Sequence, residues 1–584
     1  MRRIGVREAS MWVGAGVVAV LFVVGAWARR WIADDGLIVL RTVENLSAGH
    51  GPVFNVGERV EVNTSTVWTY VVWLVSWVGR LQPEHAVLVV SLTMSAAAVV
   101  VACVATARLY RGHQQILLVP VGVVVYVALP PARDFATSGL EVPLCLLWAA
   151  GLWWALTVWA TTELSTRTAV TVGVVAGLAP LVRPELTLAA ACAVLLVLAA
   201  PGQGWGRRVV VIVCGAALPV AYQVFRMGYY GVVVPNTAIA KEAGDAKWGD
   251  GWGYLRNFAD AYWLLIPLIL IVAIGVWMYL SRSTEGRAGV VRGRVHTPAA
   301  VVAVMVAAGV LEGVYWLRQG GDFMHARVLL VPVFMLLLPV SVIALDRRHA
   351  RLGVGAGLPL LVVATLVWAG CAAVSPGVRN GPDLIPQSVV DEREFYIRDL
   401  GRALPVDRDE YAYDRRMKPL LGLLKENRGR SGVFVLHGDH EWAFVPHTHG
   451  ADSGVAVRII MLGMTGTNVS RMVKVYDPIG LADPLAARTE RIAGARIGHD
   501  KSMPVEWVLA RAGAIPEQSL PGVYSRARTL HAATQLRTCP RFAALQRSYT
   551  APLTVRQFLS NIRHAYSNTT WRFDTDPASF RCPH

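Results

Sequence analysis

Long, almost uncharged runs of apolar residues recur through the first 375 residues of this 584-residue chain, separated by short polar loops. The runs lie at 11–27, 66–79, 86–107, 115–129, 140–160, 168–182, 185–200, 209–226, 262–280, 298–316, 327–345 and 354–374. An α-helix needs about 20 apolar residues to cross the hydrocarbon core of a bilayer. The pattern therefore predicts a polytopic α-helical membrane protein.

The last 209 residues have a different composition. Residues 1–375 contain 47 charged side chains, 28 of them Lys or Arg and 19 Asp or Glu, whereas residues 376–584 contain 49. This contrast predicts a transmembrane domain over 1–375 followed by a water-soluble domain over 376–584. A chain that is 54% hydrophobic and only 16% charged is excluded as a purely cytosolic enzyme.

The basic residues are distributed unevenly between the loops. The N-terminus and the loops 108–114, 163–168, 201–208, 281–297 and 346–352 together hold 15 Lys and Arg but only four acids. Because cytoplasmic loops collect Lys and Arg, these loops should face the cytoplasm and the acidic ones should face outward. Both assignments hold only if one early run does not cross. We expect 66–79, the shortest, to be re-entrant or half-inserted. This leaves about 11 transmembrane helices and an outward, periplasmic C-terminal domain.

Two other interpretations of the charge pattern are rejected. The net charge of +16 could suggest nucleic-acid binding, but no DNA- or RNA-binding signature is present, and helix orientation explains the basic loops, so we expect no nucleic-acid partner. The basic start could suggest a signal peptide, but residues 27–31 read Trp-Ala-Arg-Arg-Trp, a poor cleavage site. The first run is therefore expected to remain as a helix in the lipid bilayer.

The cysteines divide in the same way as the charges. Five lie within apolar runs, where a thiol behaves as a small hydrophobic group. Only Cys539 and Cys582 lie in the soluble part. Since an outward domain is in an oxidising compartment, these two are predicted to form a disulfide.

An acidic pair follows the first apolar run. Asp34 and Asp35 precede apolar residues at 37, 38, 40, 43 and 46, the spacing of a short interfacial helix that Gly49 should end. One Asp could simply cap that helix. Two adjacent carboxylates at a membrane surface are costly, however, unless a metal, another cation or a substrate binds there. We therefore predict catalytic roles for Asp34 and Asp35, with a divalent cation (Mg, Ca or Mn) as a conceivable cofactor on the same pair.

Further polar clusters lie in the other outward segments. They supply carboxylates and amides for sugar hydroxyls and cations for a lipid phosphate. The candidate donor- or acceptor-binding residues are Glu58, Glu61, Asn63, Asp134, Glu141, Arg183, Asn236, Lys241, Arg318, Asp322, His325 and Arg327. Lys241 and Arg327, with His325 or Arg318, are the candidates for the donor phosphate. Each cluster alone could be an ordinary interfacial loop.

Taken in order, these motifs resemble the GT-C superfamily of membrane glycosyltransferases, which use polyprenyl-phosphate sugars. The motifs are the 34–35 pair, the 45–61 stretch, Ser138-Gly-Leu-Glu141, Arg183-Pro-Glu185, Pro235-Asn-Thr237 with Lys241, and Gly320-Gly-Asp322 with Arg327. The resemblance implies a GT-C fold for the transmembrane domain.

Residues 31–43 and 57–66 resemble more closely the terminal β-(1→2)-arabinofuranosyltransferases of mycobacterial type, whose periplasmic cap matches 376–584 in size and position. This resemblance implies that decaprenyl-phosphoryl-arabinofuranose is the donor and that arabinan of arabinogalactan and lipoarabinomannan is the acceptor. It also implies a terminal β-(1→2) product and an active site on the periplasmic side of the cytoplasmic membrane.

The resemblance further implies retention, since donor and product are both β-linked. Retention requires a carboxylate nucleophile or a same-face, ion-pair-like route. One of Asp34 and Asp35 should face the anomeric carbon or the acceptor 2-hydroxyl, and the other should hold a metal or orient the sugar. The sequence leaves open which does which.

The soluble part reads as a mixed α/β domain, with helices expected at 388–403 and 414–426 and a strand at 431–436. After the strand comes a string rich in His and acids, from His437 to His449. Metal binding is one interpretation, but the string lacks Cys and helical ligand spacing. Glycan contact, with Trp442 stacking on a sugar, or simple loop packing is preferred.

Two alternatives remain. Another polyprenyl-phosphate-dependent GT-C transferase, moving mannose, would carry the same motifs. A lipid or sugar transporter should show paired inverted repeats, and none is found. Glu312 is the only acid well inside an apolar run. Intramembrane acids can mark ion paths, but Glu312 lies near the outer end of its run, where it could line the active site.

Overall fold

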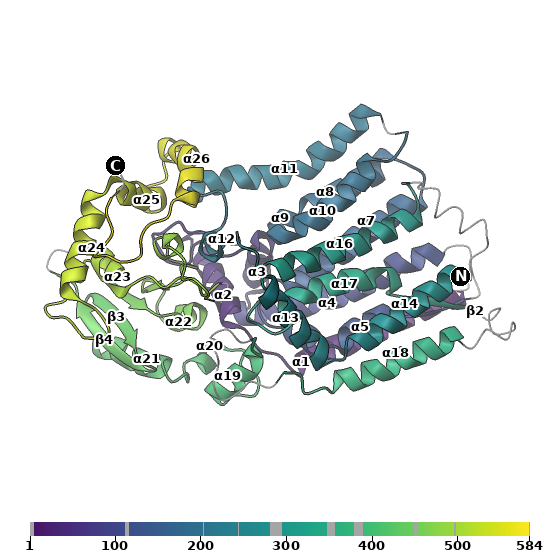
Figure 1. Cartoon of the computed structure of the whole chain (residues 1–584), viewed down its shortest axis with the longest axis horizontal. Helices are drawn as coiled ribbons and strands as arrows, with labels where there is room; N and C mark the ends of the chain where they lie inside the picture. The colour runs from purple at the N-terminus through teal and green to yellow at the C-terminus, as the bar shows by residue number, and fades with distance from the viewer. Residues whose placement is uncertain are drawn as a thin grey trace.

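The fold is described from a computed structural model of the chain. The described residues are 5–110, 116–202, 204–242, 244–280, 295–346, 357–378, 389–448, 454–495 and 498–582. Apolar helices form a bundle at one end of the molecule, and a smaller α/β part is seated on the other end (Figure 1).

The helices up to residue 373 are α1 (Val6–Trp27), α2 (Asp34–Ser47), α3 (Thr66–Gly79), α4 (Pro83–Ala107), α5 (Val121–Ala128), α6 (Pro130–Phe135), α7 (Val142–Thr161), α8 (Thr166–Gly177), α9 (Ala179–Val182), α10 (Thr187–Leu198), α11 (Trp205–Tyr230), α12 (Asn236–Lys241), α13 (Trp248–Ala261), α14 (Leu265–Leu280), α16 (Pro298–Arg318), α17 (Leu330–Leu337) and α18 (Gly357–Ala373). Short 3-10 turns lie at Arg108–Tyr110, Pro184–Leu186, Arg327–Leu329 and Leu338–Val340.

Within the described residues, α1, α4, α7, α11 and α16 are each long and apolar enough to cross a membrane, and α13 with α14 passes as a sixth span bent by 83°. Shorter apolar helices, α3 among them, run beside these. The chain is therefore a polytopic α-helical protein, while the count of 11 crossings stays a prediction.

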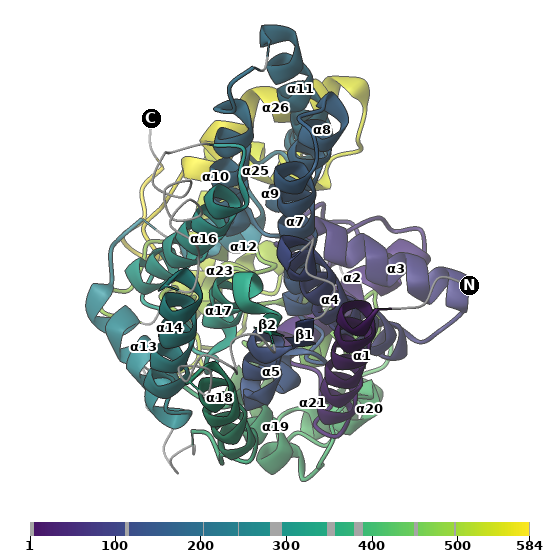
Figure 2. The same ribbon diagram turned by 90° about the vertical axis from the view of Figure 1, so that its right-hand side faces the viewer.

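The outer surface of the bundle is apolar. Helix α7 is largely buried at the centre, whereas α11 lies at the edge with almost no buried residues along its apolar length (Figure 2). Ile212, Val213 and Leu218 of α11 are each at least half exposed. An apolar surface of this extent is incompatible with water and is typical of contact with lipid.

Two expected helices differ from the prediction. The run 115–129 forms strand β1 (Ile116–Val119) and the eight-residue α5, and 327–345 forms α17 flanked by 3-10 turns and strand β2 (Ile343–Asp346). The two strands pair antiparallel at one end of the bundle (Figure 2). Prolines at 120 and 339 explain the breaks, because proline lacks the N–H that a continuing helix requires. Eight residues span only about 12 Å, so α5 cannot cross a bilayer.

The soluble part contains a mixed sheet with strand order β4-β3-β5-β6. Its strands are β3 (Gly432–His437), β4 (Glu441–Pro446), β5 (Val455–Arg458) and β6 (Lys474–Tyr476), with β3 antiparallel to β4 and parallel to β5. Its helices are α19 (Glu392–Leu400), α20 (Arg408–Tyr411), α21 (Met417–Glu426), α22 (Leu462–Asn468), α23 (Val505–Ala512), α24 (Arg526–Thr538), α25 (Pro540–Thr550) and α26 (Val555–Thr570), with a 3-10 turn at Ala486–Arg488. The two helices and the strand expected from the sequence are α19, α21 and β3.

Two sequence features of the soluble part have clear structural places. A disulfide joins Cys539 to Cys582, the predicted pair. The string at 437–449 forms the β3–β4 hairpin, and the indole of Trp442 donates a hydrogen bond to the Arg416 carbonyl at 3.0 Å. His449 lies outside the described residues. Trp442 thus packs within the domain, as in the simpler of the interpretations.

Candidate active site

The start of helix α2 lies where the bundle meets the soluble part, and the segment 134–139 holds it there. The Trp31 indole donates to the Asp134 carbonyl at 3.0 Å, and the Ala33 amide donates to the Ser138 carbonyl at 2.8 Å. Gly36 passes so close to this motif that a Cβ there would lie 2.5 Å from the same carbonyl oxygen. The Ser138 motif therefore fixes the position of the acidic pair.

Asp34 contacts the soluble part. Its carboxylate accepts backbone hydrogen bonds from Gly463 at 3.1 Å and Met464 at 2.6 Å, and so caps the N-terminus of α22. Burial raises the pKa of Asp34 to about 7, although these two hydrogen bonds lower it. One Asp of the pair therefore does cap a helix, as one interpretation of the sequence held. The helix it caps is α22, more than 400 residues later in the sequence, and not the helix that follows the pair.

Arg41 holds the other end of α22. Its guanidinium is completely buried and donates to the carbonyls of Gly466, Val473 (2.7 Å) and Phe54 (2.9 Å). An acid at the N-terminus of a helix and a cation at its C-terminal carbonyls both match the helix dipole. Helices α2 and α22 are therefore fastened side by side (Figure 1).

Asp35 contacts a different group. Its carboxylate lies 3.5 Å from Nη1 of Arg327, whose Nε is 2.5 Å from Asp322. Arg327 and Asp322 are almost fully buried, whereas about a quarter of the Asp35 side chain is exposed. The structure thus brings together three predicted site residues.

Glu392 joins this cluster from the soluble part and was missed from the sequence. Val390 and the 323–325 segment form a backbone bridge, with His325 N–H donating to the Val390 carbonyl at 2.9 Å and Val390 N–H donating to the Phe323 carbonyl at 2.8 Å. This bridge brings Glu392, at the start of α19, into the electrostatic field of Asp35 and Arg327. Burial, followed by the charge of Asp35, raises the pKa of Glu392 well above its usual range. Its Oε2 is buried without a hydrogen-bond partner among the described residues.

A second set of charges lies on the bundle side of Arg327. Arg183 pairs with Glu141 and Glu185, and lines a cavity of about 20 Å³ together with Arg327 and Glu312. Glu312 is 1% exposed, and neither of its oxygens has a hydrogen-bond partner among the described residues. Two of the predicted cations therefore share one small cavity with an intramembrane acid.

Asp134 and His325 lie in another cavity of about 20 Å³, which Glu392 also lines. Asp134 pairs with Arg29 at 2.5 Å. His325 contacts Asn257 at 2.6 Å and the Tyr262 hydroxyl at 3.1 Å. Because burial lowers the pKa of His325 to about 4, the imidazole is neutral at pH 7 and does not offer a phosphate the charge expected of it.

Several predicted residues do not join the cluster and instead hold external loops in place. Glu61 pairs with Arg226 at 2.6 Å, Glu58 with Lys474 at 3.2 Å, and the Asn236 amide donates to the Gly480 carbonyl at 2.8 Å. Asn63 is half-buried on the same loop as Glu61. Arg318 donates to the Gly244 carbonyl at 3.1 Å in an exposed contact.

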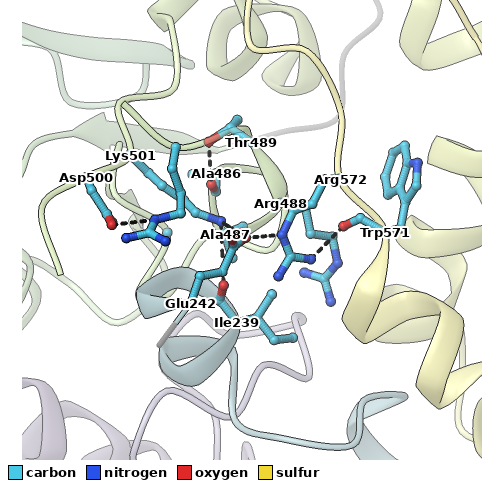
Figure 3. A network of polar contacts seen from close by, with 12 residues as sticks. Ile239, Glu242, Ala486, Ala487, Arg488, Thr489, Asp500, Lys501, Trp571 and Arg572 are labelled. Atoms are coloured by element: carbon cyan, nitrogen blue, oxygen red, sulfur yellow. Dashed lines mark hydrogen bonds and ion pairs between the residues drawn. The ribbon is translucent and has the colours of Figure 1, made fainter. Parts of the chain in front are cut away.

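Lys241 ends helix α12. The residue after it, Glu242, belongs to a network of charges (Figure 3). Its carboxylate accepts hydrogen bonds from Lys501 at 2.6 Å and from Arg572. Lys241 itself is half-buried near Gly498, where a Cβ would lie 3.4 Å from Lys241 Cε. The loop at 498–501 therefore covers Lys241 from the soluble side, and the ring of His499 lies 5.2 Å from that of Phe323 in the Arg327 loop.

The acidic pair fits a metal poorly. Both oxygens of Asp34 already accept backbone N–H groups, which leaves little donor capacity for a divalent cation. Within the described part of the chain, no three His, Cys, Asp or Glu side chains are grouped so that they could hold a metal ion.

Comparison with known proteins agrees with the motifs. A protein of Mycobacterium tuberculosis named terminal β-(1→2)-arabinofuranosyltransferase is 42% identical over 97% of this chain and 96% of its own length. This chain belongs to that family. A protein of the same name from Corynebacterium glutamicum is 38% identical over 92% of this chain and 82% of its own length. The family model for the AftB family C-terminal domain matches residues 433–582, and no solved structure matches. The family resemblance inferred from the sequence is confirmed.

Proposed function

We propose that this protein transfers arabinofuranose from decaprenyl-phosphoryl-arabinofuranose to the non-reducing ends of arabinan in arabinogalactan and lipoarabinomannan, forming terminal β-(1→2) linkages. The reaction takes place on the periplasmic side of the cytoplasmic membrane. The observation that carries the proposal is the cluster of Asp35, Asp322, Arg327 and Glu392 at the junction of an apolar bundle with a soluble cap.

The donor phosphate is met by Arg327, supported by Arg183 in the adjoining cavity. Each guanidinium already pairs with two carboxylates, so each is held in a fixed orientation. Fixed cations stabilise the charge that develops on a departing phosphate without reorganising. Lys241, beneath the 498–501 loop, is a further contact for the donor.

Asp35 faces the anomeric carbon in this proposal. Its partly exposed carboxylate, next to Arg327, is the best placed of the acidic pair to meet the sugar, whereas both oxygens of Asp34 are engaged. The bond from the anomeric carbon to the phosphate oxygen breaks, and decaprenyl phosphate leaves with the bonding electrons. Asp35 either forms a covalent arabinosyl ester, from which the acceptor 2-hydroxyl oxygen then displaces the carboxylate at the anomeric carbon, or stabilises the cationic sugar until that oxygen bonds to the same face.

Glu392 handles the proton of the acceptor 2-hydroxyl. Burial raises the pKa of Glu392, so this carboxyl holds a proton more readily than an ordinary glutamate, and its Oε2 has no hydrogen-bond partner among the described residues. Asp35 and Glu392 therefore have separate roles, one at the anomeric carbon and one at the acceptor hydroxyl. In the same-face route the departing phosphate oxygen takes the proton directly, and Glu392 only orients the hydroxyl.

The test is a transfer assay on the purified full chain, with a short prenyl-phosphoryl-arabinofuranose donor and a synthetic arabinan acceptor. Asp35→Asn and Glu392→Gln are compared with Glu394→Gln, a matched change two residues further along α19. We expect a β-(1→2) product by NMR, a loss of at least 100-fold in kcat for Asp35→Asn and of at least 10-fold for Glu392→Gln, and near wild-type kcat for Glu394→Gln.

Two outcomes distinguish the alternatives. Transfer from a prenyl-phosphoryl-mannose donor and none from the arabinose donor would keep the fold and replace the substrate. Wild-type kcat in Asp35→Asn would remove the proposed site. Because the acidic pair fits a metal poorly, equal rates in EDTA and in Mg²⁺ are expected.

A further inference from the structure

Helix α26 carries a stripe of apolar side chains that face away from the protein. Val555, Leu559 and Tyr566 are 60–78% exposed, and Ile562 lies partly buried between them. These four positions are spaced i, i+4, i+7 and i+11, so they form one continuous stripe along the helix. An aligned group of large apolar side chains on a surface indicates a contact with an apolar or amphipathic partner.

Another edge of α26 is fixed to the end of α11. The Asn561 amide donates to the Gly228 carbonyl at 2.9 Å, and the Asn568 amide donates to the Gly231 carbonyl at 3.1 Å. The two helices approach so closely that a Cβ on Gly228 would lie 2.1 Å from the ring of Phe558. The apolar stripe of α26 therefore has a fixed position relative to the apolar bundle.

The end of α11 has the features of a membrane surface. Its exposed apolar side continues through Val220 to Val224, close to the contact with α26. Its last turns carry a cluster of aromatic side chains, Tyr222, Phe225, Tyr229 and Tyr230. Tyr is enriched where a bilayer meets water. Figure 2 views the molecule from the bundle end and shows α26 running across the end of α11. Helix α26 is therefore placed at the height of the lipid headgroups.

The chain around α26 is strongly basic. Residues 518–573 contain eight arginines and no Asp or Glu. Two of these arginines, Arg556 and Arg563, are exposed on α26 itself. Their spacing of seven residues places them together, directly beside the apolar stripe. An apolar stripe flanked by arginines is typical of a helix that lies in the interface of a bilayer containing anionic lipids.

We propose that α26 is an interfacial anchor for an anionic phospholipid surface. Its apolar stripe enters the headgroup region, and Arg556 and Arg563 bind lipid phosphates. Two features favour lipid over a protein partner: the stripe adjoins the lipid-facing side of α11, and a segment with arginines and no acids is complementary to a surface of phosphates. The anchor holds the soluble part against the bilayer at a second point beside the bundle, whatever sugar the enzyme transfers.

The test uses the full chain reconstituted in vesicles of equal parts phosphatidylglycerol and phosphatidylcholine. The photoreactive residue benzoylphenylalanine replaces Leu559 in one variant. In the control variant it replaces Leu530, an exposed leucine on α24, at the end of the molecule away from the bundle (Figure 1). After irradiation, mass spectrometry identifies what is attached to each position and, for lipid, the ratio of the two headgroups.

Charge is tested in the Leu559 variant. Arg556→Glu and Arg563→Glu are introduced together, and the matched control reverses two exposed arginines of α24, with Arg526→Glu and Arg537→Glu. Both pairs change the net charge equally, so only the position of the change differs.

We expect about fivefold more lipid attached at position 559 than at position 530, with phosphatidylglycerol enriched about threefold over phosphatidylcholine. The reversal on α26 should return the headgroup ratio to that of the vesicle, and the reversal on α24 should leave the enrichment unchanged. Equal lipid attachment at the two positions would overturn the proposal. So would attachment of position 559 to a second copy of the chain in place of lipid, or an enrichment that survives the reversal on α26.

Discussion

Asp34 and Asp35 are neighbours in the sequence with different environments. Asp34 is half-buried between α2 and α22 and accepts two backbone hydrogen bonds, whereas Asp35 lies beside Arg327. The sequence predicted that the pair matters, because two carboxylates beside apolar segments are costly. It could not separate their roles, because the partner of Asp34 is a pair of backbone N–H groups, and backbone groups leave no mark in a sequence.

Glu392 shows the converse limit. It stands in a run of charged residues, 391–394, which is typical of a solvated helix start. Only the backbone bridge between Val390 and the segment before Arg327 brings it to the cluster of Asp35, Asp322 and Arg327. By contrast, Asp322 and Arg327 were predicted because charges next to an apolar run stand out.

At the residue scale, Asp34 gives the folded protein a pH dependence. Its pKa is about 7 in the fold and near 4 in an unfolded chain, so the folded state holds the extra proton between these values. The stabilisation that this group contributes is therefore complete below about pH 4, decreases as the pH rises to about 7 and does not change further above that. Each unit of difference between the folded and unfolded pKa corresponds to about 1.4 kcal/mol. Asp34→Asn should make the melting temperature depend less on pH between pH 4.5 and 8, because asparagine does not titrate. The dependence that remains comes from the other buried acids. An identical slope in the variant would contradict this.

At the element scale, the contact of α2 with α22 depends on glycine. A Cβ on Gly463 would lie 1.8 Å from the Asp34 carbonyl oxygen, and one on Gly466 would lie 2.8 Å from Arg41 Cδ. Backbone is in the way at Gly463, so no side-chain rotation relieves the clash. The two helices can therefore lie side by side only with a residue that has no Cβ at this position.

Gly463→Ala should lower the free energy of unfolding by about 1–3 kcal/mol, because overpacking forces the helices apart. It should also reduce transfer by at least 10-fold, since α2 carries Asp35. Gly422→Ala on α21, where a Cβ meets open space, is the matched control and should stabilise by about 0.5–1 kcal/mol. Thermal unfolding followed by the transfer assay measures both. Normal stability and rate in Gly463→Ala would mean that the helices tolerate separation.

The elements themselves were predicted unevenly. Long apolar helices such as α1 and α16 were recognised from the sequence, because a run of that length and composition has few other structures open to it. Helix α13 was missed, since its mixture of Gly, Trp and charge looks like a loop and its helicity depends on packing against α16. Strands β1 and β2 were missed because short apolar runs fit a strand and a helix equally well.

At the scale of the whole molecule, the orientation in the membrane follows from the loop charges. The soluble part and the loop at 163–168 are predicted to lie on opposite sides of the bilayer. In spheroplasts, a membrane-impermeant maleimide should label Glu517→Cys and leave Glu163→Cys unlabelled until the membrane is permeabilised. Both positions are exposed, so a difference reports topology. Equal labelling of the two before permeabilisation would contradict the assignment.

The fastening of α2 to α22 has a consequence for how such proteins change over time. Residues 34–41 and 463–473 form one interlocking unit built from two distant parts of the chain. The first part supplies a charged side chain for each end of helix α22, which the second part supplies. A chimera that exchanges the soluble parts of two relatives should therefore fold only when residues 34–41 are exchanged together with the soluble part. Substitutions in 34–41 and in 463–473 should accordingly occur together among relatives.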